Sequence, residues 1–294
     1  MKKILFATTA LVASAGIASA EVKLTGYAEI GIKGGSGMET QFHDDIDVSF
    51  KLSGETDGGL SFGAKIDLDE ADTGAFTGGP QQLNAVWVKG AFGKVTLGDT
   101  DGAFDWALQE IGMGTTLTDD HTTHAGYNGN SGLDGSYDGQ VLRYDNTFGD
   151  FGVAISAELD DTAVGDPAWG IGVKYNAALG GVNLGLGLGF QDNGANDIWG
   201  VSIDAKMDSG FRAILNYSDH STTGAYTGIG LGYTMDALLV TVNYGTYDLS
   251  GNDGYGLAVN YDLGGGAVVM AGYGNSSVGG VDTNTWSLGL GLSF

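Results

Sequence analysis

The amino-acid sequence predicts an all-β protein, a sixteen-stranded antiparallel barrel that crosses a membrane. Three observations lead to this fold: segments in which apolar and polar residues alternate, glycine-rich turns between them, and one long stretch with neither pattern. Alternation with a period of two places the apolar side chains on one face of a half-buried strand. The 294-residue chain has 54 glycines, two prolines and no cysteine, and 42% of its residues are hydrophobic. This apolar content argues against disorder, which low hydrophobicity would favour.

The first twenty residues predict an export signal that is separate from the barrel. Two lysines precede an uncharged apolar run over 4–17, and Ala-Ser-Ala at 18–20 supplies small residues for cleavage. This order is typical of a secretory signal peptide. We therefore expect a signal peptide over 1–20 and a mature barrel over 21–294, in which ten basic and thirty-six acidic residues give a net charge of −26. Nucleic acid is excluded as a partner because phosphate binding needs clustered Lys and Arg.

The strands follow from the alternation, which the first segment shows well. Leu24, Ile30 and Ile32 share one face, whereas Lys23 and Lys33 fall on the other. The same reading predicts sixteen strands near 22–33, 45–53, 60–69, 81–90, 94–101, 139–147, 151–159, 169–175, 182–190, 199–205, 211–217, 225–235, 238–248, 253–263, 267–275 and 286–294. The pattern leaves open which face of 225–235 and of 267–275 points outward. An even number lets both chain ends meet on one side of a closed sheet.

The connections between these strands differ in length on the two sides of the barrel. Short turns are expected at 55–59, 91–93, 148–150, 179–181, 208–210, 235–237 and 264–266, and longer loops at 34–43, 70–80, 102–138, 161–167, 192–196, 220–224, 249–252 and 276–282. This asymmetry is typical of an outer-membrane barrel, as are aromatic residues at strand ends such as Trp169, Trp199 and Trp286. A soluble β-sandwich is the alternative, but it seldom combines long strands with glycine on the other face.

The stretch from Asp99 to Gly139 breaks the pattern, with neither strand alternation nor sustained helical spacing. A structureless loop of about forty residues is uncommon in a compact domain and usually indicates function or disorder. A barrel of about sixteen strands encloses an aqueous channel rather than a packed core. We therefore expect this stretch to fold inward as a constriction loop over about 102–138.

Several segments resemble the general porins of Gram-negative bacteria, most of all the α-proteobacterial, Rhodobacter-type porins. They are the signal-bearing start, EVKLTGYAEIG at 21–31, GETDGGLSFGAKIDL at 54–68, GDTDGAFDWAL at 98–108 and the terminus WSLGLGLSF at 286–294. The resemblance implies a homotrimer in the outer membrane, surrounded by lipid and lipopolysaccharide, whose third loop folds inward. It also implies passive diffusion of small hydrophilic solutes, and recognition of the terminal Phe294 by the barrel-assembly machinery.

Charged residues in a narrow lumen with low-dielectric walls set selectivity. The residues expected at the constriction are Asp101, Asp105, Glu110, Asp119 and Asp120 on the loop, facing Lys33, Lys51, Lys65 and Arg143 on the wall. Related porins tend to carry several arginines on the second and third strands. The matching inward positions here are Asp45, Asp47 and Asp67, which favours a net acidic, cation-preferring pore.

The sequence leaves open two further possibilities, a calcium site on the constriction loop and a barrel that does not conduct. Asp99, Asp101 and Asp105 are oxygen ligands of the kind that Ca²⁺ prefers, and no other cofactor is expected. A non-conducting adhesin or structural barrel would project its longest loop outward. Glycines expected on inward faces, at Gly185, Gly187, Gly189, Gly289 and Gly291, favour an open lumen because they leave it unfilled.

A hydrolase is the less favoured alternative, and we expect that the protein is not an enzyme. Fold alone does not exclude catalysis, because unrelated functions share folds. The four histidines, His43, His121, His124 and His220, all fall in expected loops. His121 and His124 have no helix to align them as metal ligands and no evident third partner. The chain also lacks a G-x-S-x-G nucleophile motif.

Overall fold

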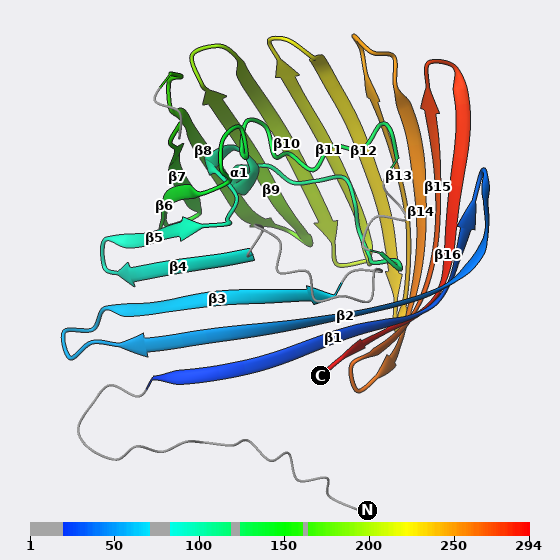
Figure 1. Ribbon diagram of the computed structural model, residues 1–294, viewed down its shortest axis with the longest axis horizontal. Coiled ribbons are helices and arrows are strands. Elements are labelled where there is room, and N and C mark those ends of the chain that lie inside the picture. The colour runs from blue at the N-terminus through cyan, green and yellow to red at the C-terminus, as the bar shows by residue number, and fades with distance from the viewer. Residues whose placement is uncertain (1–19, 71–82, 119–123, 161–163) are drawn as a thin grey trace, which may run out of the picture.

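Sixteen antiparallel strands close a barrel in the computed structural model, which describes residues 20–70, 83–118, 124–160 and 164–294 (Figure 1). The strands of the first half are β1 (Glu21–Gly35), β2 (Met38–Glu55), β3 (Ser61–Glu70), β4 (Leu83–Gly90), β5 (Gly93–Gly98), β6 (Val141–Phe148), β7 (Phe151–Glu158) and β8 (Ala168–Leu179). Those of the second half are β9 (Val182–Asp192), β10 (Asp197–Met207), β11 (Phe211–His220), β12 (Gly224–Met235), β13 (Leu238–Tyr247), β14 (Asp253–Gly264), β15 (Ala267–Val278) and β16 (Val281–Ser293). Each strand pairs with its neighbours in the chain, and β1 pairs with β16 to close the sheet.

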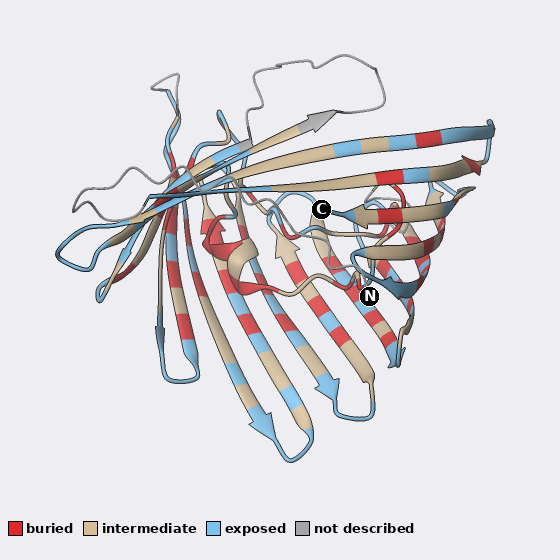
Figure 2. Ribbon diagram, turned by 90° about the horizontal axis from the view of Figure 1, so that it is seen from below, coloured by how far each residue is buried: buried red, intermediate tan, exposed pale blue. Residues whose placement is uncertain are grey.

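The predicted alternation is confirmed, because successive residues point to opposite faces of the sheet. Apolar side chains on the outer face are exposed, as at Leu24 and Ile155, and small or polar residues on the inner face are buried, as at Ser202 and Asn243. Figure 2 shows this alternation as buried and exposed bands along the strands. The two ambiguous strands are now assigned: Ile229 of β12 is exposed on the outer face, and Met270 of β15 is buried on the inner face.

Two connections are much shorter than the sequence indicates. The loops predicted at 34–43 and 276–282 are wrong, since only residues 36–37 and 279–280 separate the strands there. Glycines with positive φ at Gly37 and Gly280 permit two-residue hairpins, so pairing continues into segments whose exposed residues give little alternation. As a result His43 lies on β2 and His220 ends β11, neither in a loop.

The long stretch after β5 enters the barrel and lies against its inner wall. A short helix, α1 (Ala103–Ala107), lies beside β8 and β9 (Figure 1). We call residues 99–118 and 124–140 the inner segment. Two apolar clusters form between it and the wall, Phe104, Leu108 and Leu133 with Ile198, and Ile111 and Met113 with Ile214 and Tyr226. In the described part of the chain, the buried core therefore lies between the inner segment and the sheet.

Some expectations fall outside the described residues. These are positions 1–19 of the expected signal peptide, 71–80 and 161–163 of two expected loops, 81–82 of an expected strand, and Asp119, Asp120 and His121. Within the described ranges, none of the helical structure is long or apolar enough to cross a membrane.

The exposed outer face gives a test of lipid contact. Replacing Ile203, an exposed residue in the middle of β10, with arginine is expected to lower the free energy of unfolding in a bilayer by about 2–4 kcal/mol. Urea unfolding in lipid vesicles measures this. Lys206→Arg, on the inner face of the same strand, is the matched control and should change it by less than about 0.5 kcal/mol. Equal effects of the two variants would contradict the assignment of faces.

Candidate functional site

Side chains on the barrel wall bind the backbone of the inner segment. Near its start, the Ala103 amide donates to Ser156 Oγ on β7 at 2.8 Å, and the Gln109 amide donates to Ser202 Oγ on β10 at 2.9 Å. Ala103 is the first residue of α1, where a helix leaves its amides without an internal partner, and Gln109 lies beyond the end of that helix. The wall therefore supplies the hydrogen bonds that buried backbone groups require.

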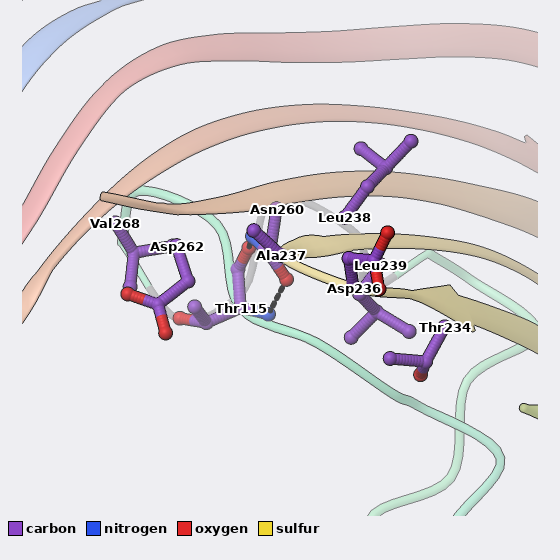
Figure 3. A pocket seen from close by; sticks show the side chains of 9 residues that line it. All are labelled: Thr115, Thr234, Asp236, Ala237, Leu238, Leu239, Asn260, Asp262 and Val268. Atoms are coloured by element: carbon purple, nitrogen blue, oxygen red, sulfur yellow. Dashed lines mark hydrogen bonds between the residues drawn. The ribbon is translucent and has the colours of Figure 1, made fainter. Parts of the chain in front are cut away.

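The inner segment is anchored on the second half of the barrel in the same way. Asn260 on β14 makes two bonds to Thr115: its Oδ1 accepts from the Thr115 amide at 2.9 Å, and its Nδ2 donates to the Thr115 carbonyl at 2.6 Å (Figure 3). Beyond it, the Thr118 amide donates to Glu29 Oε2 on β1 at 2.7 Å, and the same oxygen lies 2.9 Å from His43 Nε2. Through these contacts the segment follows the inner wall from β7, past β10 and β14, to β1.

Inward-facing glycines let the inner segment approach the wall closely. A Cβ at Gly230 would lie 2.1 Å from the Ile111 carbonyl oxygen, and one at Gly187 would lie 2.2 Å from the Ala107 carbonyl oxygen. Sequence reasoning took such glycines as a sign of an unfilled lumen. That interpretation is wrong at Gly187, Gly189 and Gly289, where Ala107, Phe104 and Leu117 respectively occupy the space. The atoms nearest to a Cβ added at Gly185 belong to Asn176 and Asp204, and those nearest to one at Gly291 belong to Tyr27 and Met270, all on the barrel wall.

The acids of the inner segment differ in their environment. Burial, together with the nearby carboxylates of Asp101 and Glu110, raises the pKa of Asp105 to about 8. Burial also raises the pKa of Asp134 to about 6, although its carboxylate accepts bonds from the Gly102 amide and from Gln191. Asp105 is therefore mostly protonated at pH 7 and adds little charge to the lumen.

Glu110 is the third acid whose environment is altered. Burial raises the pKa of Glu110, while the hydroxyl of Tyr127 donates to its carboxylate at 2.5 Å and opposes that rise. Tyr127 lies 17 residues further along the inner segment. This bond therefore ties the outgoing and returning parts of the segment together.

Arg143 on β6 fixes the beginning of the inner segment. It is almost fully buried, and its Nη1 donates to the Asp101 carbonyl at 2.5 Å, while its Nε lies 3.2 Å from Asp145 Oδ1. The Asp101 carboxylate itself lies 3.9 Å from Nη1 and is largely exposed. The predicted pairing of Arg143 with a loop acid is thus mainly a bond to that residue's backbone.

The other expected wall residues occupy inward positions but do not form one group. Lys51 and Lys65 line a recess together with Asp99 and Asp101. Lys33 lies at the opposite end of β1, near the 36–37 connection. Asp45 and Asp47 alternate with the outward Ile46 of β2, so they too face the lumen.

Asp67 also faces the lumen, from β3. It binds Lys65 Nζ at 2.5 Å and accepts a short hydrogen bond from Ser49. Its charge is therefore partly neutralised on the wall.

Sequence reasoning missed Lys174 on β8. Its ammonium lies 4.3 Å from the centre of the Trp106 ring in α1, a distance typical of a cation–π contact. Its position two residues after the inward Gly172, on an alternating strand, could have revealed it. It brings a cation to the helix that carries Asp105.

No metal centre is visible among the described residues, where no group of three or more His, Asp or Glu is arranged to hold an ion. Calcium at Asp99, Asp101 and Asp105 therefore stays a prediction. His124 has a structural contact instead: its Nε2 lies 2.7 Å from Asn243 Oδ1 on β13, and burial lowers its pKa. A neutral imidazole at this point anchors the returning part of the inner segment.

The glycine contacts can be tested by adding one methyl group. Gly230→Ala is expected to push the inner segment off the wall and to lower the free energy of unfolding by about 1–3 kcal/mol. Gly185→Ala is the control, because the atom nearest to its added Cβ is 3.4 Å away and belongs to Asn176. Unfolding in lipid vesicles measures both. A larger loss for Gly185→Ala than for Gly230→Ala would refute the docking role of these glycines.

Burial of Asp105 makes the stability of the docked segment depend on pH. The folded protein holds this proton up to about pH 8, whereas an ordinary aspartate loses it near 3.8, so stability is expected to fall as pH rises between these values. Asp134 adds to the fall below about pH 6.

Hydrogen exchange of the inner-segment amides at several pH values measures this loss. Asp105→Asn should remove most of it between pH 6 and 8, whereas Asp236→Asn, in a short turn, should retain it. An unchanged pH profile in Asp105→Asn would exclude this carboxyl as the cause.

Comparison with known proteins agrees with this architecture. A family model described as Gram-negative porin matches residues 7–293. A porin of Rhodobacter capsulatus is 32% identical over 298 residues, covering 86% of this chain and 93% of the relative.

Solved structures show the same fold. A mutant of Rh. blastica porin is 21% identical with a TM-score of 0.73, covering 93% of this chain and all of the other. A porin structure refined at 1.8 Å resolution is 25% identical with a TM-score of 0.72 and the same coverage. With the family match over almost its whole length and its closed sixteen-stranded barrel, the chain belongs to the Gram-negative porin family.

Proposed function

We propose that this outer-membrane porin conducts ions and small hydrophilic solutes by passive diffusion, and that its inner segment forms the constriction. The observation that carries the proposal is the position of this segment inside the barrel, along the wall from β7 to β1, where Ser156, Ser202, Asn260 and Glu29 bind it. A solute passing the barrel must pass between the segment and the part of the wall that it leaves uncovered. Fold and family point to a channel rather than an enzyme.

A preference for cations follows from the charges near that passage. Asp45, Asp47 and Asp99 add negative charge, and the mature chain carries a net charge of −26. Two features reduce the effect: Asp105 is mostly protonated at pH 7, and Asp67 is paired with Lys65. We therefore expect a moderate preference, which salt will screen.

The non-conducting adhesin or structural barrel is the second candidate. It requires the longest connection to project away from the barrel, whereas the described parts of this connection are bonded to the inner wall.

Assembly as a homotrimer, contact with lipopolysaccharide and recognition of Phe294 by the assembly machinery remain proposals that rest on the family.

Planar-bilayer recording in a KCl gradient tests the proposal. The reversal potential is expected to show that K⁺ permeates more readily than Cl⁻. A trimer should lose its conductance in three equal steps, one for each subunit. Asp101→Asn should lower the ratio of K⁺ to Cl⁻ permeability because the Asp101 side chain is largely exposed. Asp57→Asn, at the tip of a short turn, is the matched control and should leave the ratio unchanged. Anion preference, or no conductance, would contradict the proposal.

A further inference from the structure

Three lysines lie side by side on the inner wall, in a row that crosses three strands. Lys23 of β1 is directly opposite Lys51 of β2, which is directly opposite Lys65 of β3. Residues paired in this way have Cβ atoms about 4.5–5.5 Å apart, and like charges so placed destabilise a sheet. We call these three residues the lysine row.

The charges of the lysine row are only partly neutralised by the protein. Lys65 pairs with Asp67 at 2.5 Å. Across the described residues, no carboxylate forms an ion pair with Lys23 or Lys51, and both side chains are exposed to the lumen. In the described part of the chain, the two adjacent ammonium groups of Lys23 and Lys51 therefore have no carboxylate bonded to them, although the charge of Asp67 is close enough to act on Lys51.

A recess of about 550 Å³ opens in front of the lysine row. All three lysines line it, as does Lys94 of β5, whose ammonium lies 5.9 Å from the centre of the Trp87 ring. Its walls thus combine a group of cations with one aromatic face.

Three acids also line this recess, and their positions decide where an anion would lie. Glu21 lies two residues before Lys23, on the same face of β1. Asp99 and Asp101 line the recess on the side that follows β5. The register continues from Lys65 through Ala85 to Gly98, which puts Asp99 about two strand spacings, roughly 10 Å, away from the row. That is about one Debye length at 0.1 M salt, and Lys51 lies one strand further away, so Asp99 weakens an anion at Lys51 only slightly.

We propose that the lysine row binds solutes that carry a phosphate group with two or more negative charges. One such group can accept hydrogen bonds from two lysines that face each other across a strand pair, and it offsets their mutual repulsion. A solute with a single negative charge offsets less of it. This proposal names a class of solute for the pore, and it rests on the proposed function only for the route by which the solute arrives.

Calorimetry on the full-length mature protein in detergent tests binding without reference to conductance. Inorganic pyrophosphate, at low ionic strength, is the probe and is expected to bind. Lys51→Gln should weaken its binding about threefold to fivefold, the contribution of an exposed ion pair. Lys51→Arg, which retains the charge, should restore most of the affinity. Lys206→Gln, an inward lysine on β10 away from this recess, is the matched control and should change the affinity by less than about twofold.

The outcomes separate the site from the general field of the barrel. Absence of binding in the wild-type protein would overturn the proposal, and so would equal weakening by Lys51→Gln and Lys206→Gln. Loss of affinity in Lys51→Gln with recovery in Lys51→Arg supports it. Glutamine cannot mimic the ammonium charge, and removing one like charge from the row relieves repulsion, so these variants are expected to fold.

A bilayer recording then asks whether the bound anion affects the channel. The chain has no cysteine, so a single cysteine can be introduced by Asp57→Cys in the turn after β2. Labelling it with a membrane-impermeant thiol reagent establishes which end of the barrel faces each chamber. Pyrophosphate added on the short-turn side should reduce the KCl current more than pyrophosphate added on the other side, and Lys51→Gln should remove this difference. If binding persists in a protein that does not conduct, the proposed function fails and the site stands. If the protein conducts and Lys51→Gln changes neither binding nor current, the site fails alone.

Discussion

The need to satisfy backbone hydrogen bonds governs how a segment without regular structure can occupy the lumen. The strands bond to each other around a closed ring, so their own amides and carbonyls are paired. The inner segment has no such partner over most of its length. Its buried amides are instead satisfied by side chains from distant strands, such as Ser156 on β7 and Glu29 on β1. Loss of these polar groups would leave buried donors unpaired, which costs about 1–3 kcal/mol each.

The same inward positions serve both the lumen and the docked segment. Where the wall is bare, small and polar residues face water. Where the segment lies, glycine permits backbone to approach backbone, as at Gly230 and Ile111, and serine or asparagine supplies the bond beside it. The apolar clusters around Phe104 and Ile111 then remove hydrophobic surface from water. Docking is therefore encoded in the barrel strands as much as in the segment itself.

The strands could be predicted from the sequence because a half-buried sheet imposes a period of two on the residue types. Closure with sixteen strands followed from that count, and the inward course of 99–139 followed from its lack of any pattern. Other features had no local sequence signal. The hairpins at 36–37 and 279–280 depend on pairing between exposed residues, which need not alternate in hydrophobicity. The role of Gly187 depends on what lies opposite, which a sequence does not state. Likewise, the altered acidity of Asp105 arises from burial against segments far away in the chain.

Net charge alone is a poor guide to the field along the passage. The chain has far more acids than bases, yet Lys23, Lys51, Lys65 and Arg143 all occupy inner positions. Arg143 is buried, and its guanidinium donates to the Asp101 carbonyl, so it binds the inner segment and presents little charge to a passing solute. Asp105 is protonated near neutral pH and so contributes less than its residue type implies. Lys23 and Lys51 face the recess, and no carboxylate of the described residues forms an ion pair with either of them. The field is therefore set by which groups remain charged and unpaired, and these differ from one side of the lumen to the other. An acidic barrel can thus prefer cations overall and still present a local site for a multivalent anion.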